Sequence, residues 1–521
     1  MPPELVMRGS LRLSSSPAWR GTQIGLRAVA IACAALFAPG TEARAAEWRF
    51  DVEFTESAHA RPYSGRVYVF FSQRNREPRF GPNWFRPELF IARDVSDWRP
   101  GERLTFSTRE TAGMLAFPGE PAEIDPAGFR AQAVVRFNPR ERNVGTGPGN
   151  GFSPVVTAGA ETLAEPPLLT VDRLVPPREF RETRWTRLIE VRSRRLSEFH
   201  GRDEALRGAV MLPASYYDQP ERRYPAVFII PGFGGDHFEG ITNEPVRESN
   251  EAGVEFLRVV LDPGCPLGHH TFADSANNGP VGEALVTEFL PEFDRRFRSV
   301  AAPTGRFLTG HSSGGWSSLW LQVTYPDMFG GTWSTSPDPV DFRDFQRIDL
   351  YRPGENMYVD GEGNERPIAR AGERVLLWYR SFARMEWVLG HGGQLHSFEA
   401  VFSPRGDDGR PQLVFDRDSG AVDTGVARTW EPYDIRLVLE RNWPALGPRL
   451  AGKLHVFMGD QDTFLLEGAT VRMKESLERL GSDAVVEIHP GKDHGSLLTA
   501  ALRERIRREM TAAFLKQHDA R

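Results

Sequence analysis

The residues best suited to chemistry in this chain lie at 310–314, where the sequence reads Gly-His-Ser-Ser-Gly. A serine hydroxyl is a weak nucleophile at its ordinary pKa, so an enzyme that uses one must present it to a general base. A sharp turn from a strand into a helix exposes the serine in this way, and only small residues leave room for the crossing backbone. The spacing therefore predicts Ser312 as a nucleophile, with Gly310 and Gly314 leaving that room.

A base and an acid are predicted from the chain order of such sites, which is serine, acid, histidine. The strand-like run 454–458 ends in a turn that holds Asp460 and Asp462, and the last apolar run is followed by a glycine turn that contains His494. We predict that His494 takes the serine proton and returns it to the leaving group. One of the two aspartates would then fix the imidazole tautomer and stabilise its charged form.

Acyl transfer also needs donors for the negative charge that develops on the substrate carbonyl oxygen. The backbone N–H of Ser313, which follows the nucleophile, is one predicted donor. The second is predicted in the glycine-rich loop 231–235, directly after an apolar run, with the N–H of Phe233 preferred and that of Gly234 as the alternative. An ordinary glycine turn would explain the same loop without any catalytic role.

Alternating strands and helices are predicted from about residue 181 onward. Helical spacing of apolar residues occurs at 285–297 and 315–323. Strands separated by helices indicate a mainly parallel sheet, here with two leading antiparallel strands. The fold class is therefore α/β, an α/β-hydrolase with about eight mainly parallel strands. The predicted strands are 185–192, 207–212, 226–230, 255–261, 306–309, 331–335, 454–458 and 484–489.

The first 45 residues are typical of a signal peptide. They contain several arginines, then the apolar run 28–38, then Ala43-Arg44-Ala45 as a cleavage site. A membrane anchor is the alternative, but this run is much shorter than the roughly 20 residues of a spanning helix, and no later stretch is long enough to span a membrane. We therefore expect an exported protein, periplasmic or extracellular.

Two further regions are predicted around the hydrolase elements. Short apolar runs separated by Pro and Gly at 46–180 favour a β-rich, sandwich-like domain, and the proline-rich stretch 165–177 is predicted to be a stiff connector into the catalytic domain at 181–521. At about 340–450 a polar, Gly-rich segment interrupts the strand pattern. A loop of that length needs structure of its own, so we expect an insertion packed over the C-terminal edge of the sheet as a lid.

Composition excludes several other classes of protein. The formal net charge is −6, which argues against nucleic acid as a partner. Cys33 and Cys265 are the only cysteines, and the first lies in the predicted leader, so no intramolecular disulfide is expected.

The loop at 268–280 contains His269, His270 and Asp274, but adjacent side chains rarely point at one ion. We expect no metal there, and predict instead that the loop lines the substrate cleft or is purely structural.

Aromatic residues of the N-terminal region raise a separate question. Trp84, Phe85 and Trp98 could stack on carbohydrate, but aromatic residues in β-domains usually fill the core. Packing is therefore the preferred interpretation, and a third possibility is that the N-terminal region covers the cleft.

The elbow at Ser312, the Asp-Ser-Ala-Asn-Asn-Gly loop at 274–279, the Glu-Phe-Leu-Pro-Glu helix at 288–292 and the late Asp462 and His494 together resemble the esterase family that includes esterase D and enterochelin esterase-like proteins. The resemblance covers roughly 181–340 and 450–515. It implies an α/β-hydrolase fold, ester hydrolysis without metal or organic cofactor, and a β-rich N-terminal domain in the enterochelin esterase-like members.

The resemblance also bears on single residues. It favours Asp462 as the acid, because the family's acid usually lies three residues past the glycine, and Asp460 would then shape the turn. The chain departs from the family in having Pro231 where histidine often precedes the oxyanion glycine, and in the size of the insertion.

Together these observations predict an exported serine esterase that acts on a small-molecule or polymer-linked ester through Ser312, Asp462 and His494. Two alternatives stay open. The same triad could serve an acyltransferase or a peptidase, or the scaffold could be an inactive hydrolase that only binds.

Overall fold

The central sheet is built from the apolar runs between residues 186 and 489. The computed structural model describes residues 48–157, 166–247 and 252–519, so the predicted signal peptide lies outside the described residues. All eight predicted strands are present, in the order β11-β12-β14-β13-β19-β20-β23-β24. Strand β12 is antiparallel to both of its neighbours, and the other pairs are parallel. The bounds are β11 Thr186–Ser193, β12 Glu204–Met211, β13 Ala226–Ile230, β14 Leu257–Leu261, β19 Arg306–His311, β20 Gly331–Thr335, β23 Leu454–Gly459 and β24 Val485–His489.

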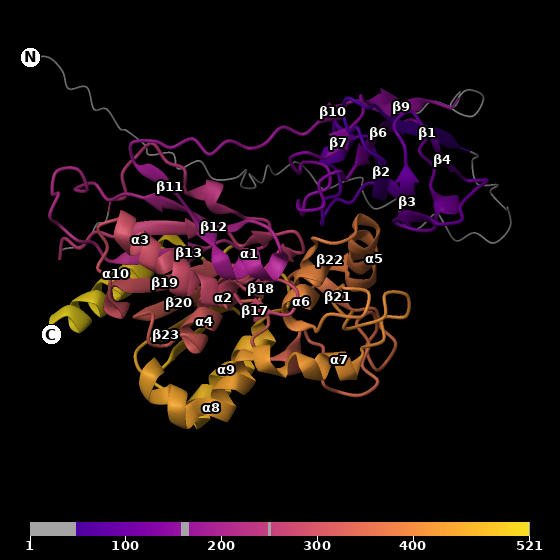
Figure 1. The fold of residues 1–521 in the computed structure, drawn as a ribbon. Helices are drawn as coiled ribbons and strands as arrows, with labels where there is room; N and C mark the ends of the chain where they lie inside the picture. Colours follow the sequence, from indigo (N-terminus) through magenta and orange to yellow (C-terminus); the bar gives the residue numbers. More distant parts are fainter. Residues whose placement is uncertain (1–47, 158–165, 248–251, 520–521) are drawn as a thin grey trace, which may run out of the picture. The chain divides into compact units, whose positions relative to one another are not determined.

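Both faces of this sheet are covered by helices (Figure 1). Successive strand residues point to opposite faces, so Phe307 of β19 packs in a core with the C-terminal helix while Leu308 packs in a core with Phe289 and Phe293. Burial on both faces is typical of parallel strands. The helices around the sheet are α1 Arg194–His200, α2 Val281–Ala284, α3 Leu290–Arg296, α4 Ser313–Thr324, α9 Glu467–Arg479 and α10 Ala500–Asp519, with a π-helical turn, Leu285–Phe289, between α2 and α3.

The N-terminal region forms two sheets that share an apolar core. One has the order β4-β1-β9, and the other has the order β10-β7-β6-β2-β3-β5 with β8 paired to β6. The strands are β1 Arg49–Phe54, β2 Tyr63–Ser72, β3 Phe90–Trp98, β4 Leu104–Ser107, β5 Met114–Phe117, β6 Arg130–Val135, β7 Gly151–Phe152, β8 Val156–Thr157, β9 Leu168–Val171 and β10 Arg173–Leu174.

The prediction of a connector at 165–177 is wrong, because β9 and β10 lie within it. Strand β9 pairs in parallel with β1, directly after Pro166 and Pro167. Proline cannot donate a ladder hydrogen bond, but a strand at the edge of a sheet can begin just after it. This stretch is therefore part of the N-terminal sheets.

Strand β2 links the N-terminal region to the rest of the molecule. Val67, Val69 and Phe71 point into the N-terminal core, whereas Tyr68 and Phe70 point into a large core shared with the segment after residue 340. The described residues, 48–157, 166–247 and 252–519, accordingly belong to one compact unit.

The segment predicted as an insertion has secondary structure of its own. It contains the hairpin β21 Pro367–Ala371 and β22 Arg374–Trp378, followed by α5 Tyr379–Leu389, α6 Gln394–Phe402, α7 Thr424–Thr429 and α8 Ile435–Leu450. Short hairpins lie upstream of the elbow, formed by β15 Gly264–Cys265 with β16 Gly268–His269 and by β17 Asp274–Ser275 with β18 Gly279–Pro280. Within the described ranges, no helix has both the length and the apolar character needed to cross a bilayer.

Candidate active site

Ser312 lies on the turn between β19 and α4, with φ 60° and ψ −127°. A residue with a side chain rarely adopts this backbone conformation, and such strain occurs where the surrounding structure imposes it. A Cβ on Gly310 would lie 2.1 Å from the carbonyl oxygen of Gly314, and one on Gly314 would lie 1.9 Å from the carbonyl oxygen of Ile230. Neither glycine can be replaced without moving the turn, which is the arrangement predicted from the sequence.

His494 and Asp462 meet at the carboxyl ends of the last two strands. The Nδ1 of His494 lies 2.8 Å from the Oδ2 of Asp462, whose carboxylate is fully buried. The other oxygen, Oδ1, accepts the backbone N–H of Phe464 at 2.8 Å. An imidazole that donates from Nδ1 to a carboxylate keeps Nε2 unprotonated, so the ring is arranged as a general base.

Two rings fix the plane of His494. The ring centroid of His311 lies 4.6 Å away, and that of Phe464 lies 4.9 Å away in an edge-to-face contact. Burial, together with the nearby His494, lowers the pKa of His311 to about 3, so His311 is neutral at ordinary pH. It therefore packs against His494 without adding charge.

Asp460 occupies a different place from Asp462. Its Oδ1 accepts the N–H of Gly491 at 2.7 Å, and its own N–H donates to the carbonyl of His489 at 3.2 Å. These bonds join the turn after β23 to the turn after β24. Of the two candidate acids, the structure brings Asp462 to His494 and assigns Asp460 to the turn.

The glycine-rich loop after β13 lies beside the nucleophile. A Cβ on Gly232 would lie 4.0 Å from the Oγ of Ser312. In the described part of the chain, no hydrogen-bond acceptor is found for the N–H groups of Ser313, Phe233 or Gly234.

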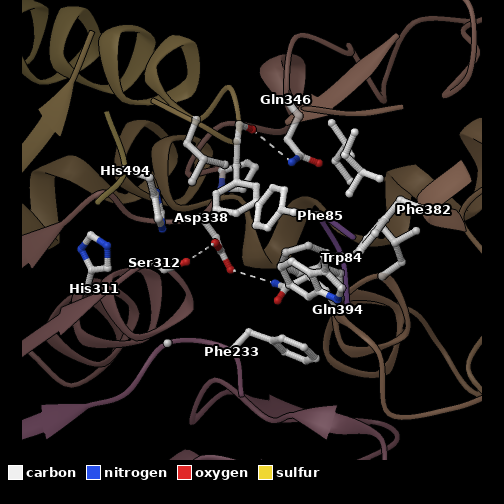
Figure 2. Close-up of a pocket in the computed structure, with 18 residues that line it drawn as sticks. Trp84, Phe85, Phe233, His311, Ser312, Asp338, Gln346, Phe382, Gln394 and His494 are labelled. Atoms are coloured by element: carbon white, nitrogen blue, oxygen red, sulfur yellow. Dashed lines mark hydrogen bonds between the residues drawn. The ribbon is translucent and has the colours of Figure 1, made fainter. Parts of the chain in front are cut away.

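A buried carboxyl group that the sequence analysis missed lies next to the nucleophile (Figure 2). The Oδ2 of Asp338 accepts the hydroxyl of Ser313 at 2.5 Å and the Nε2 of Gln394 at 3.3 Å, and its Oδ1 lies 3.5 Å from the Oγ of Ser312. Burial raises the pKa of Asp338 to about 6. The sequence feature that could have identified Asp338 as a site residue is its position three residues after β20. The carboxyl ends of neighbouring parallel strands share one edge of a sheet, so a side chain there lies near the nucleophile.

A cavity of about 320 Å³ opens at Ser312 and His494. Its walls are mainly apolar, and they come from the N-terminal region, the loop after β13 and the predicted insertion. Figure 2 shows aromatic rings on several sides of Ser312. The aromatic residues that line it, apart from the two histidines, are Trp84, Phe85, Phe233, Phe382, Phe398 and Phe464.

The three aromatic residues of the N-terminal region have two different fates. Trp98 is buried in the core of the N-terminal sheets. Trp84 stacks on Phe233, with centroids 5.6 Å apart, and meets Phe382 edge to face at 5.0 Å, while Phe85 lines the same cavity. Trp98 is therefore a packing residue, whereas Trp84 and Phe85 line the cavity at Ser312.

The loop that contains His269 and His270 does not line this cavity, contrary to one of the two expectations for it. Both imidazoles are buried, and the Nε2 of His269 bonds to the backbone of Pro231 at 3.0 Å. The role of this loop is therefore structural support. No group of three or more His, Cys, Asp or Glu side chains suited to a metal ion occurs among the described residues.

Comparison with known proteins finds a family match for the part of the chain that carries Ser312. Residues 202–374 match the family model described as "Putative esterase", and no curated protein matches the chain. Similar solved structures are a ferulic acid esterase (14% identity, 63% of this chain and 98% of that chain covered, TM-score 0.38), an S-formylglutathione hydrolase from Agrobacterium tumefaciens (13%, 63% and 94%, 0.37) and the fluorophosphonate-binding serine hydrolase F of Staphylococcus aureus (14%, 63% and 98%, 0.36). With TM-scores below 0.5, these similarities carry no argument about substrate or mechanism.

The matched segment runs from β12 through β21 and contains the nucleophile elbow, the glycine-rich loop after β13 and Asp338. The segment that carries Ser312 thus matches the esterase family model, and the chain is a serine hydrolase of carboxylic esters.

Proposed function

We propose that this enzyme hydrolyses carboxylic esters through an acyl-enzyme formed on Ser312, with His494 as the base and Asp462 as the acid that orients it. The observation that carries the proposal is the 2.8 Å contact between the Nδ1 of His494 and the Oδ2 of Asp462, in the cavity that also exposes Ser312. This contact leaves Nε2 as the proton acceptor on the side of the ring away from the carboxylate.

In the first half-reaction the Oγ of Ser312 attacks the ester carbonyl carbon while Nε2 of His494 takes the hydroxyl proton. The N–H groups of Phe233 and Ser313 stabilise the oxyanion of the tetrahedral intermediate. The bond between the carbonyl carbon and the alcohol oxygen then breaks. The alcohol leaves with the proton held by His494, and the acyl group stays on Ser312.

In the second half-reaction a water molecule replaces the alcohol. His494 takes one water proton as the water oxygen attacks the acyl carbon, and the same two N–H groups stabilise the second oxyanion. The bond to Oγ breaks, Ser312 regains its proton from His494, and the carboxylic acid is released. No redox step and no change of cofactor state is involved.

The walls of the cavity indicate which esters fit. Apolar and aromatic side chains dominate it, and Asp338 is the one carboxyl group among its lining residues. Transfer of a charged group into such a site is costly unless it is paired. We therefore propose that the substrates are uncharged esters whose buried part is apolar or aromatic. We also propose that the protein is exported and that the segment 1–45 is its leader.

The test combines a fluorophosphonate probe, peptide mapping and a series of p-nitrophenyl esters of increasing acyl length. One adduct on Ser312 together with turnover supports the proposal. A folded protein that gives no adduct and no turnover contradicts it and favours a binding role. Transfer of the acyl group to an added alcohol or amine, or cleavage of an amide, would identify the acyltransferase or peptidase alternatives. N-terminal sequencing of the exported product tests the leader.

A further inference from the structure

The loop after β13 is held by side chains from two other parts of the chain. At its first residue, the Nε2 of His269 lies 3.0 Å from the carbonyl oxygen of Pro231. The Nδ1 of His269 accepts the N–H of Thr271 at 3.1 Å, so the ring proton is on Nε2 and the bond to Pro231 is a donation. Burial lowers the pKa of His269 to about 3, which keeps this tautomer neutral.

At the other end of the loop, Arg142 of the N-terminal region reaches across to two peptide groups. Its Nη2 lies 2.9 Å from the carbonyl oxygen of Gly234 and 3.0 Å from that of Gly235, and its Nη1 lies 3.4 Å from the carbonyl oxygen of Gly268. The guanidinium carbon lies 6.0 Å from the ring centroid of Phe233. Hydrogen bonds from a charged donor are stronger than neutral ones, and a single guanidinium nitrogen here donates to two consecutive carbonyls.

The segment that carries Arg142 is itself braced. The fully buried Asn150 donates from Nδ2 to the carbonyl oxygens of Asn143 at 3.1 Å and Val144 at 3.0 Å. A Cβ on Gly392 would lie 2.8 Å from the carbonyl oxygen of Arg142, so the backbone before α6 packs directly against this residue. Arg142 therefore presents its guanidinium from a fixed base.

These contacts are linked to the predicted oxyanion donor through two peptide groups of the loop. The N–H of Gly235 donates to the carbonyl of Gly232 at 3.0 Å, and Arg142 holds the carbonyl of Gly234, which belongs to the same peptide group as that N–H. The carbonyl of Gly232 and the N–H of Phe233 belong to the same planar peptide, so the bond that orients one orients the other. Gly234 has φ +91°, and glycines on both sides of Phe233 give the loop conformations that other residues would exclude.

We propose that Arg142 is a positioning residue for the oxyanion hole. It holds the loop in the one conformation that aims the Phe233 N–H at the substrate oxygen, and it makes the N-terminal region part of the catalytic machinery. This inference rests on the proposed function. It also explains why a flexible glycine-rich loop can serve as a preorganised donor, because the loop's carbonyls are bound by His269, by Gly235 and by Arg142.

The test compares Arg142→Ala and Arg142→Lys with Arg140→Ala. Arg140 is an exposed arginine of the same segment that pairs with Glu204 at 3.2 Å and does not touch the loop. Loss of one oxyanion donor costs roughly 100-fold or more in kcat, so we expect Arg142→Ala, which only misplaces a donor, to lower kcat by about 10-fold with KM nearly unchanged. Phenylboronic acid, which forms a tetrahedral adduct on the serine, should bind about 10-fold more weakly.

Arg142→Lys should recover part of the activity, since one ammonium can bind one of the two carbonyls, and millimolar guanidinium should partly rescue Arg142→Ala. Arg140→Ala should behave as the wild type. Equal losses in the two alanine variants, or a rise in KM at constant kcat and constant boronate affinity, would overturn the inference. If Arg142→Ala does not fold, Arg142→Lys is judged by the same criteria. Ser312→Ala, run in parallel, tests the proposed function separately.

Discussion

The Oδ1 of Asp338 lies 3.5 Å from the Oγ of Ser312, so the nucleophile rests beside a buried carboxyl group that is not part of the proposed triad. The contact is long for a hydrogen bond between two oxygens, and it is therefore weak. The other carboxyl oxygen is held by Ser313 and Gln394. The serine hydroxyl can thus leave Asp338 for His494 at little cost, while the carboxyl group itself stays fixed.

Asp338→Asn should change how stability depends on pH. Burial raises the pKa of Asp338 from 3.8 to about 6, so the folded state binds the proton more tightly than the unfolded state. The corresponding stabilisation is complete below about pH 4 and is lost as the pH rises through about 6. Asparagine cannot ionise. The relevant quantity is the free energy of unfolding of Asp338→Asn minus that of the wild type. This difference should be roughly 1 to 3 kcal/mol larger near pH 8 than near pH 4.

Urea unfolding of both proteins at several pH values between about 4 and 8 measures this difference. The Asp460→Asn variant is the control, because Asp460 lies in a turn and partly faces solvent. Parallel stability curves for the wild type and Asp338→Asn would show that the buried carboxyl group does not titrate in this range.

Substitution of the nucleophile should separate catalysis from backbone strain. Ser312→Ala and Ser312→Gly should both lose essentially all turnover, since neither has a hydroxyl. Ser312 has φ 60° and ψ −127°, a conformation that costs roughly 1 to 3 kcal/mol for a residue with a Cβ. Glycine relieves that strain but adds freedom to the unfolded chain. In urea unfolding, the free energy of unfolding of Ser312→Gly should therefore exceed that of Ser312→Ala by about 1 kcal/mol. The reverse order would refute strain at the elbow.

A matched pair of substitutions distinguishes the two aspartates after β23. Asp462→Asn should lower kcat by roughly 10⁴-fold, because the amide favours the wrong tautomer of His494. Asp460→Asn keeps an acceptor for the N–H of Gly491 and should keep most of the activity. Steady-state kinetics on one p-nitrophenyl ester is sufficient. A larger loss in the Asp460 variant would transfer the acid role to that residue.

Trp84→Ala should alter specificity more than catalysis. Trp84 forms one wall of the cavity against Phe233 and Phe382, at some distance in sequence from the reacting groups. Its loss should raise KM for short acyl esters and shift the preference in kcat/KM toward longer ones. Phe80→Ala is the control, since Phe80 is an exposed aromatic of the same region that does not line the cavity. An unchanged chain-length profile would remove Trp84 from the substrate site.

Sequence spacing predicted the parts of the molecule that depend on local order. The elbow could be predicted because Gly310 and Gly314 have no alternative there, and the eight strands could be predicted because each is a short apolar run between turns. The contact between His494 and Asp462 could be predicted because chain order and strand ends restrict where such residues can lie. The stretch 165–177 was predicted wrongly because prolines were given more weight than the apolar residues that follow them.

The rest of the site depends on contacts between residues far apart in sequence. Asp338 approaches Ser312 because β20 is the neighbour of β19, and strand order is not contained in spacing. Arg142 reaches a loop about 90 residues away, and Trp84 reaches the cavity from the N-terminal sheets. Nothing in the local sequence of Arg142 or Trp84 distinguishes it from a surface or core residue.

The alternation of side chains along β2 has a consequence for how the protein comes apart. Val69 and Phe71 fill one core, while Tyr68 and Phe70 fill the other. Unfolding of either core would therefore displace β2 and remove packing from the other core as well. The Oη of Tyr68 also bonds to the carbonyl of Leu389 at 2.6 Å. Calorimetry should therefore record a single endotherm for both regions, with equal calorimetric and van't Hoff enthalpies. The catalytic domain, 181–521, should aggregate when it is expressed without residues 46–180.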